Sequence, residues 1–184
     1  MAANKQSYKN AHDETTGAFE SEAAFNCWVK TTQKSLVRFC RQFVNDWNEA
    51  DDMAQEAYIR AWQKQSSFRG KSSLITWQMA IARRVCLDYL RKTKKMTTVQ
   101  LNEHDTALAN DIDTTIDVQR ALQKLSEDDR VVLYLRTGEE LSFDDIAQIL
   151  ALTAAACRKR YERAKSRFEA IYNNTKPVKE TKEE

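Results

Sequence analysis

The chain has 184 residues with a formal net charge of +2, and 30% of its residues are Asp, Glu, Lys or Arg. Glycine occurs three times and proline once, so residues that interrupt helices are nearly absent. This composition favours an all-α protein and argues against sheet-rich classes. We find no secretory leader and no apolar run that could cross a bilayer, so we expect a cytoplasmic protein without membrane insertion.

The four cysteines and two histidines are scattered, without the close spacing that zinc ligands need. Each cysteine falls in an apolar helical pattern, which predicts small buried side chains in a reducing compartment. Acidic residues in helices, with no histidine, metal motif or glycine-rich loop nearby, argue against paired-carboxylate catalysis. We therefore expect no metal, no cofactor and no enzymatic activity, and we look for the function in binding.

In chain order, residues 1–20 are polar without periodicity and predict a flexible N-terminal extension. Residues 21–95 show helical spacing of apolar side chains and predict a first helical domain. Its third helix is expected from Leu74 to about Lys92, after a Ser- and Lys-containing loop at 64–73. One compact core is expected here because this part holds all four tryptophans: Trp28, Trp47, Trp62 and Trp77.

The second half begins after a polar, weakly periodic stretch at 96–113, which predicts a linker. Residues 114–172 predict a second helical domain of four helices. Ser126 and Ser142 each precede acidic residues and an apolar run, which is typical of helix N-caps. Residues 173–184 form a polar tail.

A helix-turn-helix pattern runs from Asp144 to Arg167, with a short helix, a tight turn and a longer basic helix. Thr153 is placed to cap the second helix, whose alanine-rich first turn allows close approach to a DNA groove. A solvated basic face on a bundle that does not bind DNA is the alternative. The residues suited to bases and phosphates are Arg158, Lys159, Arg160 and Arg163.

Two features of the first domain are less specific. The basic loop that starts at Lys64 carries the aromatic Phe68 and suits single-stranded DNA, although an ordinary surface loop is slightly favoured by the residues alone. An acidic, polar patch is by itself explained as the solvated side of an amphipathic helix. The patch consists of Asp51, Asp52, Gln55 and Glu56.

Several motifs together resemble a known family. Residues 48–62 resemble the "DAEDLVQETFLRAW" signature of sigma region 2, and residues 68–91 resemble the stretch that follows it. Residues 122–136 and 139–167 resemble sigma region 4. Their order and spacing over residues 25–171 resemble an extracytoplasmic-function (ECF) sigma factor of the sigma-70 family.

This resemblance implies an alternative sigma factor that binds core RNA polymerase, recognises the −35 and −10 promoter elements and initiates transcription. It implies contact with the polymerase flap and control by an anti-sigma factor. Contact with the clamp helices of the largest polymerase subunit is implied for Asp51, Asp52, Gln55 and Glu56. Binding of −10 DNA is implied for Lys64, Phe68, Arg69, Lys71, Trp77, Arg83, Arg84 and Arg91. Binding of −35 DNA is implied for Thr153, Arg158, Lys159, Arg160 and Arg163.

The chain departs from the family pattern at three positions. Arg84 stands where Asn is usual, which leaves the −10 base preference open. Ala151 replaces the usual turn glycine, so a tighter or shifted turn is expected. Ser126 replaces a frequent proline, a mild change because serine also begins helices well.

Two other functions stay open at this level. A stand-alone helix-turn-helix transcriptional regulator with a helical sensor domain would account for residues 144–167 but not for the acidic patch. A protein that only sequesters a partner is the third hypothesis.

The length of the linker bears on how the two domains are held. About twenty flexible residues span roughly 25 Å when relaxed and about 70 Å when extended. The two promoter elements of the family lie more than one DNA turn of roughly 34–36 Å apart. We therefore expect the polymerase to hold the domains apart and the free protein to be compact or flexible.

Overall fold

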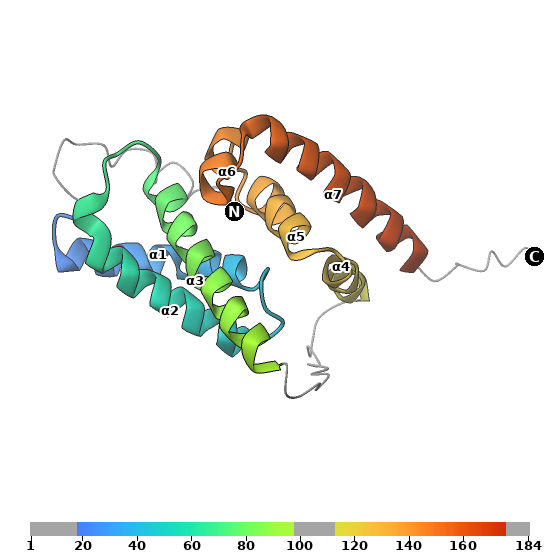
Figure 1. Cartoon of the computed structure of the whole chain (residues 1–184), viewed down its shortest axis with the longest axis horizontal. Coiled ribbons are helices and arrows are strands. Elements are labelled where there is room, and N and C mark those ends of the chain that lie inside the picture. Colours follow the sequence, from blue (N-terminus) through green and yellow to red (C-terminus); the bar gives the residue numbers. More distant parts are fainter. Residues whose placement is uncertain (1–17, 98–112, 176–184) are drawn as a thin grey trace, which may run out of the picture.

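The computed structural model describes residues 18–97 and 113–175, which form helices and turns without strands. The expected all-α class is confirmed. The helices form two groups that lie side by side in Figure 1. The α1–α3 half contains α1 (Glu22–Cys40), α2 (Trp47–Lys64), the short 3₁₀ helix η1 (Gln65–Ser67) and α3 (Leu74–Thr97). The α4–α7 half contains α4 (Asp113–Gln123), α5 (Glu127–Leu133), the π-helical turn η2 (Tyr134–Gly138), α6 (Phe143–Leu150) and α7 (Ala154–Thr175).

The structure tests the predicted end of the third helix, but it describes little of the predicted linker. Helix α3 runs to Thr97, beyond the expected end at Lys92, because the following lysines and methionine favour helix and no glycine or proline ends it. The predicted linker lies largely outside the described residues. Among the residues that are described, no helix combines the length and the apolar character needed to cross a membrane.

The core of the α1–α3 half is built on an alanine stripe. Ala50, Ala54, Ala57 and Ala61 are buried along one face of α2, which lets α1 and α3 approach closely. Larger side chains such as Phe39 and Met79 fill the space around this stripe.

The expectation that the tryptophans form the core was wrong for two of them. Trp47 is 43% exposed and Trp62 is 36% exposed. Burial was also wrongly expected for Cys27, which points away from the packed face of α1, whereas Cys40, Cys86 and Cys157 are buried.

The helix starts of the α4–α7 half are fixed as the sequence indicates. The Asp129 N–H donates to Ser126 Oγ at 3.3 Å, and the Asp145 N–H donates to Ser142 Oγ at 3.1 Å. Gly138 ends η2 where a Cβ would lie 3.2 Å from ring carbons of Tyr134. A larger residue would force that ring to move.

The two halves pack on each other through a continuous apolar core, with α3 against α6. Hydrogen bonds between described residues of the two halves also join them. Thr76 Oγ1, nearly fully buried, donates to Asp145 Oδ1 at 3.1 Å. Arg130 Nε donates to the Gln42 carbonyl at 3.0 Å, and Tyr134 Oη lies 2.9 Å from the Ser35 carbonyl. The described molecule is therefore closed, with its halves in direct contact.

The turn between α6 and α7 keeps its usual geometry despite its alanine. Ala151 is left-handed, with φ 54° and ψ 47°, and the Leu152 N–H donates to the Ala147 carbonyl at 3.0 Å. This bond closes a Schellman turn, which normally carries glycine at the left-handed position. A Cβ in that conformation is strained by about 1–2 kcal/mol.

Replacing Ala151 with glycine is expected to stabilise the protein. Relief of backbone strain outweighs the entropy that glycine adds to the unfolded chain, which leaves a net gain of about 0.5–1 kcal/mol in the free energy of unfolding. Urea unfolding measures this. The matched control is Ala170→Gly on exposed α7, where the same change should destabilise by about 1 kcal/mol. Loss of stability in Ala151→Gly would show that the turn is not strained.

Candidate nucleic-acid interface

Helix α7 presents one face to the core and one to solvent. The Ala156 N–H donates to Thr153 Oγ1 at 3.2 Å, so Thr153 caps the helix as expected. Cys157 and Ala164 are fully buried. Three of the basic candidates lie exposed on the other side: Arg158, Lys159 and Arg163.

An aromatic ring holds two of the cations near the helix-turn-helix. The guanidinium carbons of Arg136 and Arg158 lie 5.0 Å and 5.1 Å from the ring centre of Phe143, the first residue of α6. Contacts of this kind restrict the guanidinium without neutralising it. Arg158 is therefore positioned, and still charged, at the junction of α6 and α7.

Arg160 is placed differently from the other basic candidates. Its side chain is 28% exposed and forms an ion pair with Asp128 at 2.8 Å. Farther along α7, Arg167 pairs at 2.6 Å with the buried Asp129. Both acids lie in the first turn of α5, so sequence spacing within α7 gave no sign of these pairs.

The loop between α2 and α3 combines exposed cations with a packed aromatic pair. Lys64, Arg69 and Lys71 are exposed. Phe68 is partly buried, with its ring centre 5.3 Å from that of Trp77. The pair fastens the loop to the start of α3.

The basic candidates on α3 divide between solvent and the second half. Arg84 and Arg91 are exposed, whereas Arg83 is partly buried. Burial lowers the pKa of Arg83, Asp128 opposes this effect, and the Arg160 charge adds to it. Because Asp128 and Arg160 belong to α5 and α7, Arg83 lies close to the α4–α7 half in the closed molecule.

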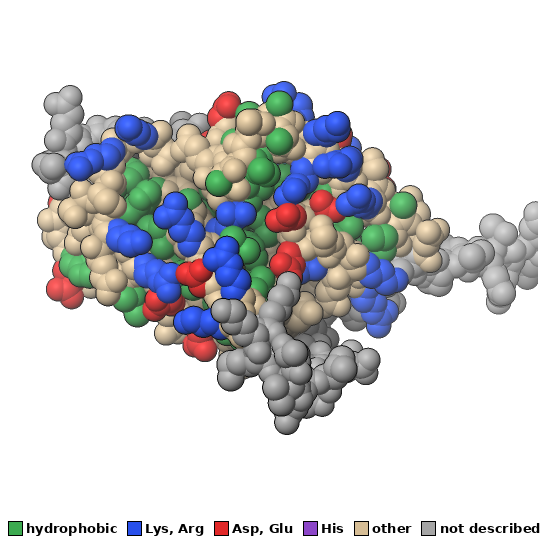
Figure 2. Space-filling model, in the orientation of Figure 1, with side chains coloured by type: hydrophobic (Ala, Val, Ile, Leu, Met, Phe, Trp, Pro, Cys, Tyr) green, Lys and Arg blue, Asp and Glu red, His purple; other side chains and the backbone are tan. Residues whose placement is uncertain are grey.

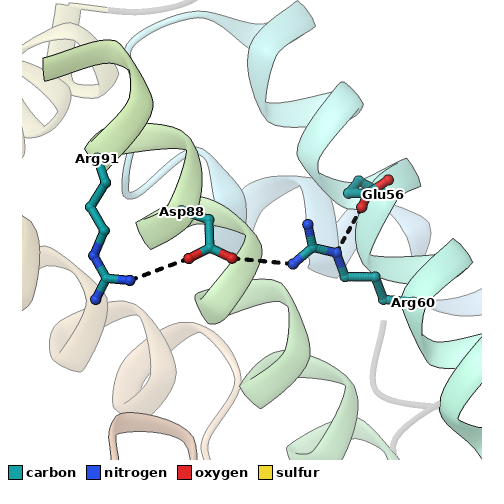
Figure 3. A network of polar contacts seen from close by, with 4 residues as sticks. All are labelled: Glu56, Arg60, Asp88 and Arg91. Atoms are coloured by element: carbon teal, nitrogen blue, oxygen red, sulfur yellow. Dashed lines mark hydrogen bonds and ion pairs between the residues drawn. The ribbon is translucent and has the colours of Figure 1, made fainter. Parts of the chain in front are cut away.

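The acidic patch on α2 is connected to α3 by ion pairs. Figure 3 shows the chain of contacts, in which Glu56 binds Arg60 at 2.7 Å and Asp88 bridges Arg60 and Arg91 at 3.3 Å each. Arg60 was not among the predicted site residues, although its spacing four residues after Glu56 was a usable signal.

The rest of the patch is more exposed. Gln55 Nε2 donates to Asp51 Oδ2 at 2.6 Å, and Asp52 is exposed. The patch therefore presents carboxylates and an amide on the outer side of α2.

The surface view agrees with this distribution of charge. Figure 2 shows Lys and Arg side chains over both halves of one face, with acidic side chains between them. Among the described residues, no group of three His, Cys, Asp or Glu side chains could hold a metal ion. What the structure offers is two cationic regions on separate helical halves.

Models of two known protein families match the two helical halves of the chain. The model for sigma-70 region 2 matches residues 28–96, and the model for sigma-70 region 4 matches residues 115–168. The RNA polymerase sigma-H factor of Pseudomonas aeruginosa is 32% identical over 174 residues, which cover 84% of this chain and 88% of that protein. The ECF RNA polymerase sigma factor SigX of Bacillus subtilis is 27% identical over 155 residues, covering 77% and 80% of the two chains.

Two solved structures share the fold. The sigma factor RpoE from Bartonella quintana, in complex with the anti-sigma factor NepR, has a TM-score of 0.71 at 24% identity and covers 83% of this chain and 98% of its own. CnrH in complex with the cytosolic domain of CnrY has a TM-score of 0.66 at 20% identity, covering 86% and 94%. The family matches account for both helical halves, and this chain is an ECF sigma factor of the sigma-70 family.

Proposed function

We propose that this sigma factor reads −35 duplex DNA with the outer face of α7 and captures melted −10 DNA at the loop between α2 and α3. The observation that supports this most directly is the pairing of a capped, outward-facing basic helix with a separate basic and aromatic loop on one chain. Duplex reading needs a helix that fits a groove, and capture of unpaired bases needs cations with an aromatic wall.

In the −35 interaction, Arg158 and Arg163 approach base edges and Lys159 approaches phosphate. Arg160 supports them by fixing α7 to α5 through Asp128. Thr153, with its side chain on the cap, keeps the first turn of α7 in place at the groove. The small alanines of that turn keep the approach open.

Arg158→Ala is expected to weaken discrimination of the −35 sequence by about 1–3 kcal/mol, because a guanidinium contact to a base edge is lost. Transcription from matched and scrambled −35 templates measures this, together with affinity for core polymerase, which should stay unchanged. Lys124→Ala is the control, since it removes an exposed cation of the same half outside α7. Equal loss of polymerase affinity and −35 selectivity would contradict the assignment.

The −10 interaction uses the loop cations Lys64, Arg69 and Lys71 on the backbone of the melted strand. The wall for an unstacked base is made by Phe68 and Trp77. Arg83, Arg84 and Arg91 extend the basic surface along α3. Because Arg83 lies close to the second half in the closed molecule, full use of this surface requires the halves to separate.

Polymerase binding is assigned to the acidic patch, with the clamp helices of the largest subunit as its partner. Asp52 and Gln55 are exposed for this contact, while Asp51 and Glu56 hold Gln55 and Arg60 in position. The flap of the polymerase is the proposed partner of the α4–α7 half.

Asp52→Lys is expected to weaken binding to core polymerase about tenfold or more, because it places a cation where complementary charge is required. Fluorescence anisotropy with core enzyme measures the loss, and binding of −35 duplex by the free protein should not change. Glu20→Lys makes the same charge change at an exposed position outside α2. If both variants lose affinity equally, the effect belongs to net charge and the patch is not the docking surface.

Reconstituted transcription tests the function as a whole. Core enzyme with this protein is expected to initiate at promoters on which core enzyme alone is silent. A stand-alone helix-turn-helix regulator is not favoured, because the region 2 match covers most of the α1–α3 half, from residue 28 to residue 96. One solved neighbour is a sigma factor bound to an anti-sigma factor, which supports an anti-sigma partner for this chain as well.

A further inference from the structure

A cavity of about 240 Å³ lies between the two halves, away from the basic face of α7 and from the loop before α3. It is formed by the end of α1 and the start of α2 on one side, and by α4, α5 and the start of η2 on the other. Arg38, Arg41 and Arg130 line it, and its lining contains no carboxylate among the described residues. The cavity therefore concentrates three positive charges in a confined space.

Two of these guanidinium groups are held in place by main-chain carbonyls. Arg41 Nη1 donates to the Val44 carbonyl, while Arg130 donates through Nε to Gln42 at 3.0 Å and through Nη1 to Leu125 at 2.8 Å. An arginine has five N–H donors, so each keeps donors for a ligand. The Nε atom of Arg41 is buried without a hydrogen-bond partner in the described part of the chain, so the donors of Arg41 that a ligand could reach are those of its terminal nitrogens.

The electrostatics of the cavity favour an anion. Burial lowers the pKa of Arg41, the Arg130 charge lowers it further, and Asp46 opposes both effects. Burial also lowers the pKa of Arg130, with Glu127 opposing. These two cations are thus partly desolvated and repel each other, and a negative ligand placed between them would relieve both penalties.

The planar guanidinium groups of the three arginines indicate which kind of anion the cavity would bind. Guanidinium groups bind phosphate oxygens through two parallel hydrogen bonds, and three of them match an anion with several charges. The side-chain amides of Gln119 and Gln123 add neutral donors, and Trp47 supplies an aromatic wall. We propose that this cavity binds a small anion carrying two or more phosphate groups.

Because the cavity lies between the two halves, a bound ligand would also affect how the halves are held together. Arg38 and Arg41 belong to the α1–α3 half and Arg130 belongs to the α4–α7 half, so one anion contacts both. A ligand that binds only when the halves are together stabilises the closed arrangement by mass action. The ligand would stabilise the closed sigma factor before polymerase separates the halves. The residues that bind it lie outside the proposed promoter and clamp contacts.

Calorimetric titration of the full chain with inorganic pyrophosphate tests the site without polymerase or DNA. Saturable binding is expected, and Arg38→Gln should weaken it about tenfold, as expected for the loss of one charge-assisted contact. The control is Lys34→Gln, which removes an exposed cation from the same helix outside the cavity and should change the affinity less than twofold. Arg38 is exposed, and its contact with the cavity residue Gln42 runs through its main-chain carbonyl, which the substitution keeps, so both variants should fold.

Titrations with other anions distinguish ligands that carry phosphate groups from other multivalent anions. A nucleoside triphosphate should bind at least as well as pyrophosphate, and citrate, a trianion without phosphate, should bind more weakly. Pyrophosphate should raise the midpoint of urea unfolding of the full chain, because it binds only the closed arrangement. Absence of binding, equal losses in the two variants, or citrate binding as tight as pyrophosphate would overturn the proposal. Because no step involves polymerase, these outcomes are independent of whether the proposed promoter contacts are correct.

Discussion

The contact between α3 and α6 is the constraint on which the behaviour of this sigma factor depends. The two halves share one apolar core, and the buried hydrogen bond from Thr76 to Asp145 fixes their register. Helix α3 carries part of the basic surface proposed for −10 DNA, and α6 positions α7 for −35 DNA. The helices proposed for promoter binding therefore also hold the molecule closed, and at Arg83 the proposed promoter surface lies close to the second half.

Separation of the halves is unfavourable in free energy for the free protein. Opening exposes apolar side chains of a shared core and leaves Asp145 and the Gln42 and Ser35 carbonyls without their partners across the interface. Core polymerase, through the separate contacts proposed for the acidic patch and for the α4–α7 half, can supply the compensating contacts. If the proposed contacts are correct, the closed state is a resting form that binding to polymerase replaces.

Much of the fold followed from local signals in the sequence. Helical periodicity, the caps Ser126, Ser142 and Thr153, and the scarcity of glycine and proline predicted an all-α chain with a helix-turn-helix. The errors came from contacts between distant segments. Trp47 and Trp62 are exposed because alanines on α2 make the close helix crossing, and Arg160 pairs with an acid on α5 that no spacing within α7 reveals. A compact free protein was one of the two expected alternatives, but the particular surfaces that meet could not be predicted, since they come together only after both halves have folded.

The distance between the halves, measured with and without core polymerase, tests this account most directly. Cys27 is exposed while the other three cysteines are buried, so one dye can be placed on it and the second on an introduced cysteine at the exposed position Glu169→Cys of α7. We expect a single narrow distribution of distances in the free protein and a clearly longer distance at saturating core polymerase. An unchanged distance in the complex would contradict this expectation, because the surface of α3 proposed for −10 DNA would then stay against the second half during initiation.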